Sequence, residues 1–143
     1  MFNNLITDLT KKVQSNYFVK EKFESGIILL AWEVKSIRLY GCSIVKSYAY
    51  FKNFEFWISN FYVNIPLFVN NSNLKQDRTK KLLLNKKQIL YYNNLLKVKG
   101  FSIIPSRVYW KNNFIKIELF FCKGKKNIDK KNDIKYKYMY NES

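Results

Sequence analysis

The sequence predicts a small antiparallel β-barrel with a few helices. Apolar residues alternate with polar ones over short runs, which is the pattern of strands that bury one face. Polar turns separate these runs, and one longer segment, residues 85–99, has helical spacing instead. At 143 residues, of which 48% are hydrophobic, the chain is long enough to bury one core.

The expected organisation is one barrel domain between two basic segments. Residues 1–15 are polar, carry the basic pair Lys11 and Lys12, and predict an N-terminal arm or a short helix. The barrel is expected over residues 16–122. Residues 123–143 are rich in lysine and too sparse in apolar residues for a packed element, so we expect a tail that is disordered when free.

The first part of the barrel predicts a strand that begins near Tyr17 and ends at a turn, Ser25–Gly26. The apolar run from Ile27 to Trp32 predicts a second strand, buried on both faces. Such a strand needs a cover on each side. A short helix over Glu33–Leu39 could supply one.

The middle of the chain predicts a hairpin. Its strands are Tyr48–Lys52 and Glu55–Val63, joined around Asn53. The segment Leu67–Asp77 is polar and rich in asparagine, and it predicts a long loop.

The segment Asn85–Lys99 predicts the longest helix. Asn85 can cap its start and Gly100 can end it. Helical spacing places three apolar residues on one face: Ile89, Tyr92 and Leu96.

The last hairpin is expected from Phe101–Trp110 and Phe114–Cys122. Pro105 within its first strand predicts an edge or a bulge. In the second strand, Lys116 lies between inward-facing residues and should point outward: Ile115, Ile117, Leu119 and Phe121 alternate with polar neighbours. Short strands with an inserted helix are typical of the oligonucleotide-binding (OB) barrel.

The charge predicts a polyanionic partner. Lysine and arginine total 26 against 10 acidic residues, a net charge of +16. Lysine, asparagine, isoleucine, phenylalanine and tyrosine are all abundant, which indicates an A/T-rich coding bias. That bias raises lysine on its own and weakens the charge argument without removing it.

Several chemistries lack their parts. The chain has no histidine, and Cys42 and Cys122 are far apart, so neither a metal site nor a cofactor is expected, and the cysteines predict reduced thiols in the cytoplasm. No signal peptide or membrane span is indicated, and the tail lacks an apolar face for a membrane surface. Acid–base catalysis has no paired groups, so we do not expect an enzyme.

Candidate RNA contacts follow from spacing. Lys35 and Arg38 share one face if their segment is helical. Around the run Leu82–Leu84, we expect the leucines in the core and the flanking lysines outward, among them Lys80, Lys81 and Lys86. Three tyrosines are candidates for stacking on bases: Tyr17, Tyr48 and Tyr109.

Three segments in register resemble the sequence motifs of one protein family. Glu24–Leu29 followed by Trp32–Arg38 resembles "EAGIVL-x-G-x-EVKSLR". Arg78–Lys86 is similar to "R-x-RKLLLHK". Tyr109–Lys111, with the later Lys123–Lys131, looks like "LYFK" and "AKGKK-x-x-DKR". These are motifs of the SmpB (SsrA-binding) proteins, and the resemblance covers roughly residues 11 to 140.

This resemblance implies an OB-type barrel that binds the transfer-RNA-like domain of transfer-messenger RNA (tmRNA). Such a complex enters a stalled ribosome, delivered by elongation factor Tu. The C-terminal tail then reaches from the decoding centre into the empty mRNA channel along small-subunit rRNA. The family catalyses no reaction itself, uses no cofactor, and is expected to be a monomer when free.

The resemblance also implies roles for particular residues. It links Glu24, Leu83 and Lys116 to RNA binding, although Leu83 could equally be a core residue. Its ribosome-binding tail matches Lys123, Gly124, Lys125, Lys126, Asp129, Lys130 and Lys131. The family's N-terminal "R-x-A-R-H" appears here as Lys12–Asn16, so one arginine contact and a histidine contact are missing.

Two alternatives remain. A general single-stranded RNA-binding barrel of the translation apparatus would share the charge and the fold, but it would not prefer a transfer-RNA-like ligand. A lysine-based nuclease is the second alternative, and it would degrade RNA on incubation.

Overall fold

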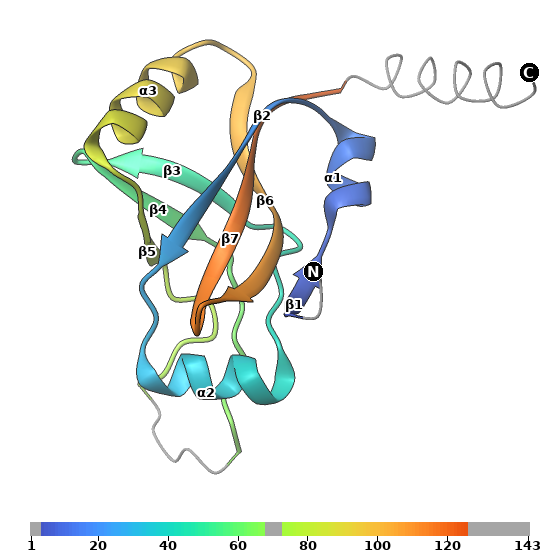
Figure 1. The fold of residues 1–143 in the computed structure, drawn as a ribbon, viewed down its shortest axis with the longest axis vertical. Helices are drawn as coiled ribbons and strands as arrows, with labels where there is room; N and C mark the ends of the chain where they lie inside the picture. Colours follow the sequence, from blue (N-terminus) through green and yellow to red (C-terminus); the bar gives the residue numbers. More distant parts are fainter. Residues whose placement is uncertain (1–3, 68–72, 126–143) are drawn as a thin grey trace, which may run out of the picture.

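The structure, a computed structural model, describes residues 4–67 and 73–125. Its centre is one seven-stranded antiparallel sheet in the order β1-β6-β3-β4-β5-β2-β7, and an additional β6–β7 pairing closes it into a barrel (Figure 1). The predicted class, a mainly β barrel with helices, is confirmed.

Three long strands form one wall of the barrel. They are β2 (Tyr17–Ile27), β6 (Phe101–Lys111) and β7 (Phe114–Gly124). β7 lies between the other two and pairs with both along most of its length. The predicted irregularity at Pro105 is confirmed, because the β6–β7 register shifts between Pro105 and Arg107.

Shorter strands complete the ring. The hairpin β3 (Tyr48–Lys52) and β4 (Glu55–Ser59) forms as expected, and its turn residues Asn53 and Phe54 both have positive φ. β4 ends four residues before the predicted Val63. Two strands were not predicted: β1 (Leu5–Asp8), which pairs with β6, and β5 (Lys80–Leu83), which joins β4 to β2.

In the described part of the chain, three helices pack around the barrel. α2 (Ala31–Tyr40) lies across one end, α3 (Lys86–Leu96) lies at the opposite end, and α1 (Thr10–Asn16) packs against the side (Figure 1). Within the described ranges, no helix is long and apolar enough to cross a membrane. The helices expected over residues 33–39 and 85–99 are present, the second ending at Leu96.

The strand predicted from Ile27 to Trp32 is wrong. β2 continues through Ser25 and Gly26, where a turn was expected, and ends at Ile27. Ile28 and Leu30 are each 45% exposed. The Glu33 carboxylate accepts the backbone N–H of Leu30 at 2.7 Å, which satisfies a free donor at a helix start. The apolar run from Ile27 to Trp32 did not by itself indicate that α2 begins there.

The main core fills the barrel with buried side chains from β3, β4, β5, β6 and β7, of which Phe56, Ile58, Ile103, Ile117 and Leu119 are fully buried. A second, smaller cluster lies outside the barrel wall beneath α1. There Val13 packs with Phe120 and Cys122. The outer face of β2, β6 and β7 is therefore covered by α1 near one end only.

The start of α3 provides a direct test of the capping prediction. Asn85 Oδ1 accepts the N–H of Gln88 at 2.8 Å, and the Gln88 side chain accepts the N–H of Asn85 at 3.3 Å. We expect Asn85→Ala to lower the free energy of unfolding by about 1 kcal/mol. Urea denaturation measures this, with Asn94→Ala, at an exposed position in the last turn of α3, as control. Equal losses in both variants would contradict the capping role.

Candidate nucleic-acid interface

One group of side chains gathers on the outer face of the barrel, away from α1. We call Glu24, Leu83, Tyr109, Lys111 and Lys116 the outer-face cluster. The Tyr109 hydroxyl donates a hydrogen bond to the Glu24 carboxylate, and Lys111 Nζ lies 3.3 Å from the same group. The cluster therefore joins residues from four strands, β2, β5, β6 and β7.

Gly26 allows the cluster to close. In the sheet register it lies opposite Lys116 on one side and Leu83 on the other. A Cβ at this position would lie 3.5 Å from Lys116 Nζ and 3.4 Å from Leu83 Cβ. Because glycine has no side chain here, the Lys116 ammonium group can approach across the backbone of β2 toward Leu83. Leu83 itself is 52% exposed, so the structure places it at the surface rather than in the core.

The electrostatics of the outer-face cluster keep Glu24 ionised. Burial raises the pKa of Glu24, but hydrogen bonds from Tyr109 and Lys111 and the nearby Lys116 charge outweigh it, so the net pKa lies below its usual value. Burial and the hydrogen bond to Glu24 raise the pKa of Tyr109. The cluster thus presents a carboxylate acceptor, a phenol and two ammonium groups side by side.

Removing one hydroxyl tests this arrangement. We expect Tyr109→Phe to raise the pKa of Glu24, because the phenol no longer stabilises the carboxylate. The folded-state pKa is lowered, so the stability that Glu24 contributes is present above its unfolded pKa and is lost as pH falls through the folded one. The variant should therefore reduce the part of the protein's stability that is lost as pH falls. An NMR titration of labelled glutamate measures it.

The matched control is Tyr91→Phe. It removes a similar hydrogen bond, from the Tyr91 hydroxyl to Glu21 at 2.5 Å. It should leave the titration of Glu24 unchanged. An unchanged Glu24 titration in Tyr109→Phe as well would show that the Tyr109 hydroxyl does not set this pKa.

The two basic residues expected on one face of a helix, Lys35 and Arg38, are both exposed on α2. Arg38 lies over the Trp110 ring, with its guanidinium carbon 5.4 Å from the ring centroid. This cation–π contact joins α2 to the end of β6. Because Trp110 alternates with Tyr109 and Lys111 along β6 and packs against the main core, this contact lies on the other side of the strand from the outer-face cluster.

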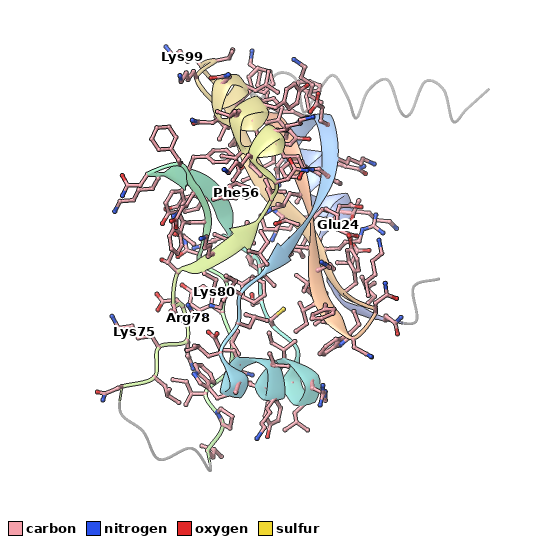
Figure 2. All side chains as sticks on the ribbon, turned by 60° about the vertical axis from the view of Figure 1, so that its left-hand side comes forward. Glu24, Phe56, Lys75, Arg78, Lys80 and Lys99 are labelled. Atoms are coloured by element: carbon pink, nitrogen blue, oxygen red, sulfur yellow. The ribbon has the colours of Figure 1, made fainter. Side chains whose placement is uncertain are left out.

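Lys80, expected to point outward to RNA, is fully buried, and this corrects the prediction. Its ammonium group donates to the carbonyls of Phe61 at 3.0 Å and Arg78 at 2.7 Å, and lies 3.5 Å from Glu33 Oε2. Arg78 holds the same carboxylate with two hydrogen bonds, at 2.6 and 3.2 Å. Figure 2 shows Arg78 and Lys80 between the barrel strands and α2. We call Glu33, Arg78 and Lys80 the buried ion network.

The burial of Lys80 follows from the two-residue period of side chains along β5. Successive side chains point to opposite faces of a strand, so Leu82 points into the core while Lys81 and Leu83 point outward. Lys81 forms an exposed pair with Glu55 at 3.5 Å. Lys86 is exposed at the first position of α3. The expectation that all leucines turn inward and all lysines outward is wrong for this strand.

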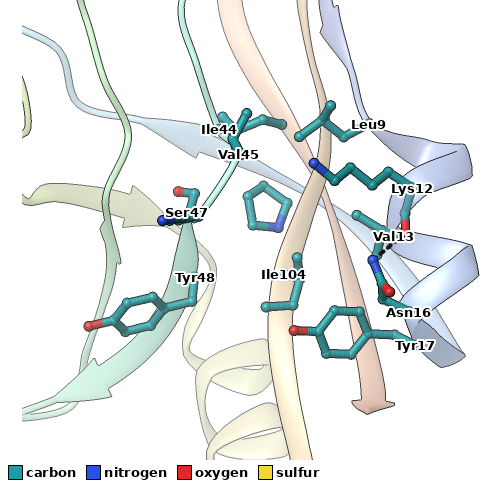
Figure 3. Close-up of a pocket in the computed structure, with 12 residues that line it drawn as sticks. Leu9, Lys12, Val13, Asn16, Tyr17, Ile44, Val45, Ser47, Tyr48 and Ile104 are labelled. Carbon is teal, nitrogen blue, oxygen red and sulfur yellow. Dashed lines mark hydrogen bonds between the residues drawn. The ribbon is translucent and has the colours of Figure 1, made fainter. Parts of the chain in front are cut away.

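A separate opening, the α1 groove, lies between α1, β6 and the start of β3. Its volume is about 450 Å³ and its lining includes Lys12, Tyr17 and Tyr48. Figure 3 shows the two tyrosines on different sides of the opening, with Lys12 reaching over it from α1. Lys11 is exposed on the same helix. The structure thus brings three of the candidate RNA contacts together, apart from the outer-face cluster.

The C-terminal candidates begin where β7 ends. Lys123 and Gly124 are the last residues of β7, and the N–H of Lys125 donates to the Asn16 carbonyl at 2.9 Å. Lys125 Nζ also lies 4.8 Å from the centroid of the Phe18 ring. The other predicted tail residues lie outside the described residues: Lys126, Asp129, Lys130 and Lys131.

Spacing did not identify Lys111. It lies two residues after Tyr109 in a strand, so strand alternation could have placed both on one face. Its contact with Glu24 depends on the β2–β7–β6 register, which the sequence did not supply. In the described part of the chain, no three or more histidine, cysteine, aspartate or glutamate side chains form a group that could hold a metal ion.

A closed antiparallel barrel that carries an exposed cluster of basic, aromatic and apolar side chains is a nucleic-acid-binding barrel of the oligonucleotide-binding type. Comparison with known proteins narrows this class. The family model described as SmpB protein matches residues 8–143. The chain belongs to the SmpB family.

Individual proteins similar to this chain support its membership of the SmpB family. A protein named SsrA-binding protein from Geotalea uraniireducens (strain Rf4) is 39% identical over 129 residues, which is 90% of this chain and 85% of the relative. One from Malacoplasma penetrans (strain HF-2) is 41% identical over 127 residues, 89% of this chain and 87% of the relative. A chain from the solved structure "tmRNA-SmpB: a journey to the center of the bacterial ribosome" aligns with a TM-score of 0.65 at 28% identity, covering 84% of this chain and 88% of that chain.

Proposed function

We propose that this chain binds the transfer-RNA-like domain of tmRNA and acts with it in trans-translation, the rescue of stalled ribosomes. Membership of the SmpB family supports this, as does its similarity to a chain from a tmRNA–SmpB ribosome structure. The observation that carries the proposal is geometric. Glu24, Leu83 and Lys116 are separated along the chain, and they meet in one exposed cluster.

The side chains of the outer-face cluster are suited to contact the backbone of a folded RNA. Lys116 and Lys111 can each neutralise a phosphate, and Glu24 can accept a hydrogen bond from a ribose 2′-hydroxyl or a base amino group. Leu83 offers an apolar contact beside them. The 2′-hydroxyl contact would favour RNA over DNA at this position.

The remaining parts of the proposal concern delivery and the ribosome. We infer that the protein acts as a monomer in the cytoplasm, that elongation factor Tu delivers the complex, and that the protein catalyses no reaction. Residues 126–143 would reach from the decoding centre into the empty mRNA channel. Their lysines would face rRNA phosphates there.

The test is competition between the transfer-RNA-like domain of tmRNA and ordinary alanine transfer RNA for binding, at about 150 mM salt, where long-range attraction is screened. We expect a preference of about tenfold or more, ~1.4 kcal/mol. The preference should survive deletion of residues 126–143. Deletion from residue 123 is unsuitable, because Lys123 and Gly124 belong to β7. Equal binding to both RNAs would favour a general RNA-binding barrel.

A further inference from the structure

The α1 groove combines features that the outer-face cluster lacks. It is a concave opening with an apolar floor, formed in part by Val13, Ile104 and Pro105. Tyr17 and Tyr48 stand on different sides of it (Figure 3). At about 450 Å³ it falls within the size range of small-ligand sites and is too small for a stacked base pair with its neighbours.

The fold keeps this groove open. α1 is fastened to the barrel through Val13, which packs on Phe120 and Cys122 over the outer face. β3 starts at Tyr48 and pairs with β6 only at Ala49 and Ile103. The space between the helix and the start of β3 is consequently not filled by a strand. Tyr48 is 45% exposed and its neighbour Val45 is 48% exposed.

The charge around the groove is positive. Lys12 and Lys46 are its charged lining residues, and the described lining contains no acidic side chain. Lys123 and Lys125 lie nearby, because Tyr17 pairs with Gly124 and Lys125 bonds to Asn16. An apolar slot with aromatic walls and lysines at its rim fits an anionic ligand that carries a flat ring.

We propose that the α1 groove binds one unstacked nucleotide of an RNA strand. Its base lies against the Tyr48 and Tyr17 rings over the apolar floor, and its phosphates face Lys12 and Lys46. Single-stranded loops and bulges can supply such a base, whereas a base within a duplex cannot reach the groove. The proposal rests on the proposed function only in taking RNA as the ligand. The groove is a separate site, because it shares no residue with the outer-face cluster.

The probe is a fluorescent uridine hexamer, since pyrimidine runs stack weakly on themselves and leave their bases available. Fluorescence anisotropy with the full chain measures its affinity. We expect Tyr48→Leu to weaken binding about five- to 150-fold, which corresponds to the ~1–3 kcal/mol of one stacked base. Tyr48→Phe keeps the ring and should stay within about twofold of the unsubstituted protein.

Two controls make the outcome decisive. Tyr40→Leu removes a tyrosine that is 58% exposed at the end of α2 and should not change hexamer binding. A short RNA duplex should bind the unsubstituted protein and Tyr48→Leu equally. Equal losses in Tyr40→Leu and Tyr48→Leu, or an equal effect on the duplex, would overturn the groove proposal. Thermal melting of each variant verifies that the barrel is folded.

The two proposals fail in different ways. If the outer-face cluster does not select the transfer-RNA-like domain, the unsubstituted protein shows no preference over alanine transfer RNA, whatever the hexamer does. If the groove does not hold a nucleotide, the preference for the transfer-RNA-like domain over alanine transfer RNA persists, and Tyr48→Leu leaves the affinity for the hexamer unchanged. A Lys12→Gln variant adds a second readout, because losing one phosphate contact lowers the salt slope of hexamer binding by about 0.7 for a single strand.

Discussion

Glu33→Gln is expected to lower the free energy of unfolding by about 3–5 kcal/mol, the largest loss among the changes considered. The substitution keeps the size of the side chain and removes its charge. Lys80 would then remain fully buried without its acidic partner, and Arg78 would lose a bidentate contact. A domain of ordinary stability, about 5–15 kcal/mol, would lose a large part of its margin.

Urea denaturation at neutral pH measures the loss. The matched control is Glu55→Gln, which removes the exposed pair with Lys81 and should cost less than about 1 kcal/mol. A second variant, Glu33→Gln with Lys80→Met, removes both charges and should recover part of the loss, because no unpaired charge stays buried. If the double variant is as unstable as the sum of the single changes, the cost does not come from the buried lysine.

The acid dependence of stability has the same origin. Burial raises the pKa of Glu33. Hydrogen bonds from Arg78 and the Leu30 N–H, together with the charge of Lys80, lower the pKa by more than burial raises it, so the net pKa lies below its usual value. Its stabilising contribution is complete above the unfolded pKa of about 4.3 and disappears as pH falls through the lower, folded value. Glu33→Gln should therefore weaken the fall in stability below that pH.

The buried ion network also explains why two of the recognised segments occur together. Glu33 belongs to the segment at the start of α2, and Arg78 and Lys80 belong to the segment that leads into β5. A contact across 45 residues fixes α2 against the end of the barrel. Arg78 and Lys80 of the second segment thus hold α2 against the barrel, whereas Lys81 and Leu83 of β5 face outward.

Local patterns predicted the elements whose signals are local. The second strand of the last hairpin alternates from Ile115 to Leu119, and Lys116 is half-buried on the outward side between the buried Ile115 and Ile117, as expected. α3 begins after Asn85 because its cap needs only residues three apart. The alternation determines which face of the strand is buried, and the cap determines where the helix begins.

Other features depended on distant partners. The alternation in β5 is too short to reveal which side faces the core, and Lys80 became an inward residue only because Glu33 neutralises it there. β1 has only four residues, too few to show a strand pattern, and its pairing with β6 places it in the sheet. The assignment of Glu24 to RNA binding came from the resemblance to the SmpB family, since spacing alone favours an ordinary acid at a strand end.

Lys116→Glu is expected to weaken binding to the transfer-RNA-like domain of tmRNA by about 10- to 100-fold at physiological salt, ~1.4–3 kcal/mol. The new carboxylate would face an RNA phosphate and would also lie beside Glu24, whose own charge Lys116 helps to stabilise. Loss of the phosphate contact should reduce the slope of log affinity against log salt by about 0.9 in a duplex region. The measurement is a filter-binding series over several salt concentrations.

Net charge alone changes nonspecific attraction, so Lys97→Glu, at the exposed C-terminal end of α3, is the matched control. It alters the total charge equally and should weaken binding far less, because it lies outside the outer-face cluster. Lys116→Gln separates the lost contact from the added repulsion and should give an intermediate affinity. If Lys97→Glu and Lys116→Glu weaken binding equally, the RNA responds to the overall charge of the protein and the outer-face cluster does not position it.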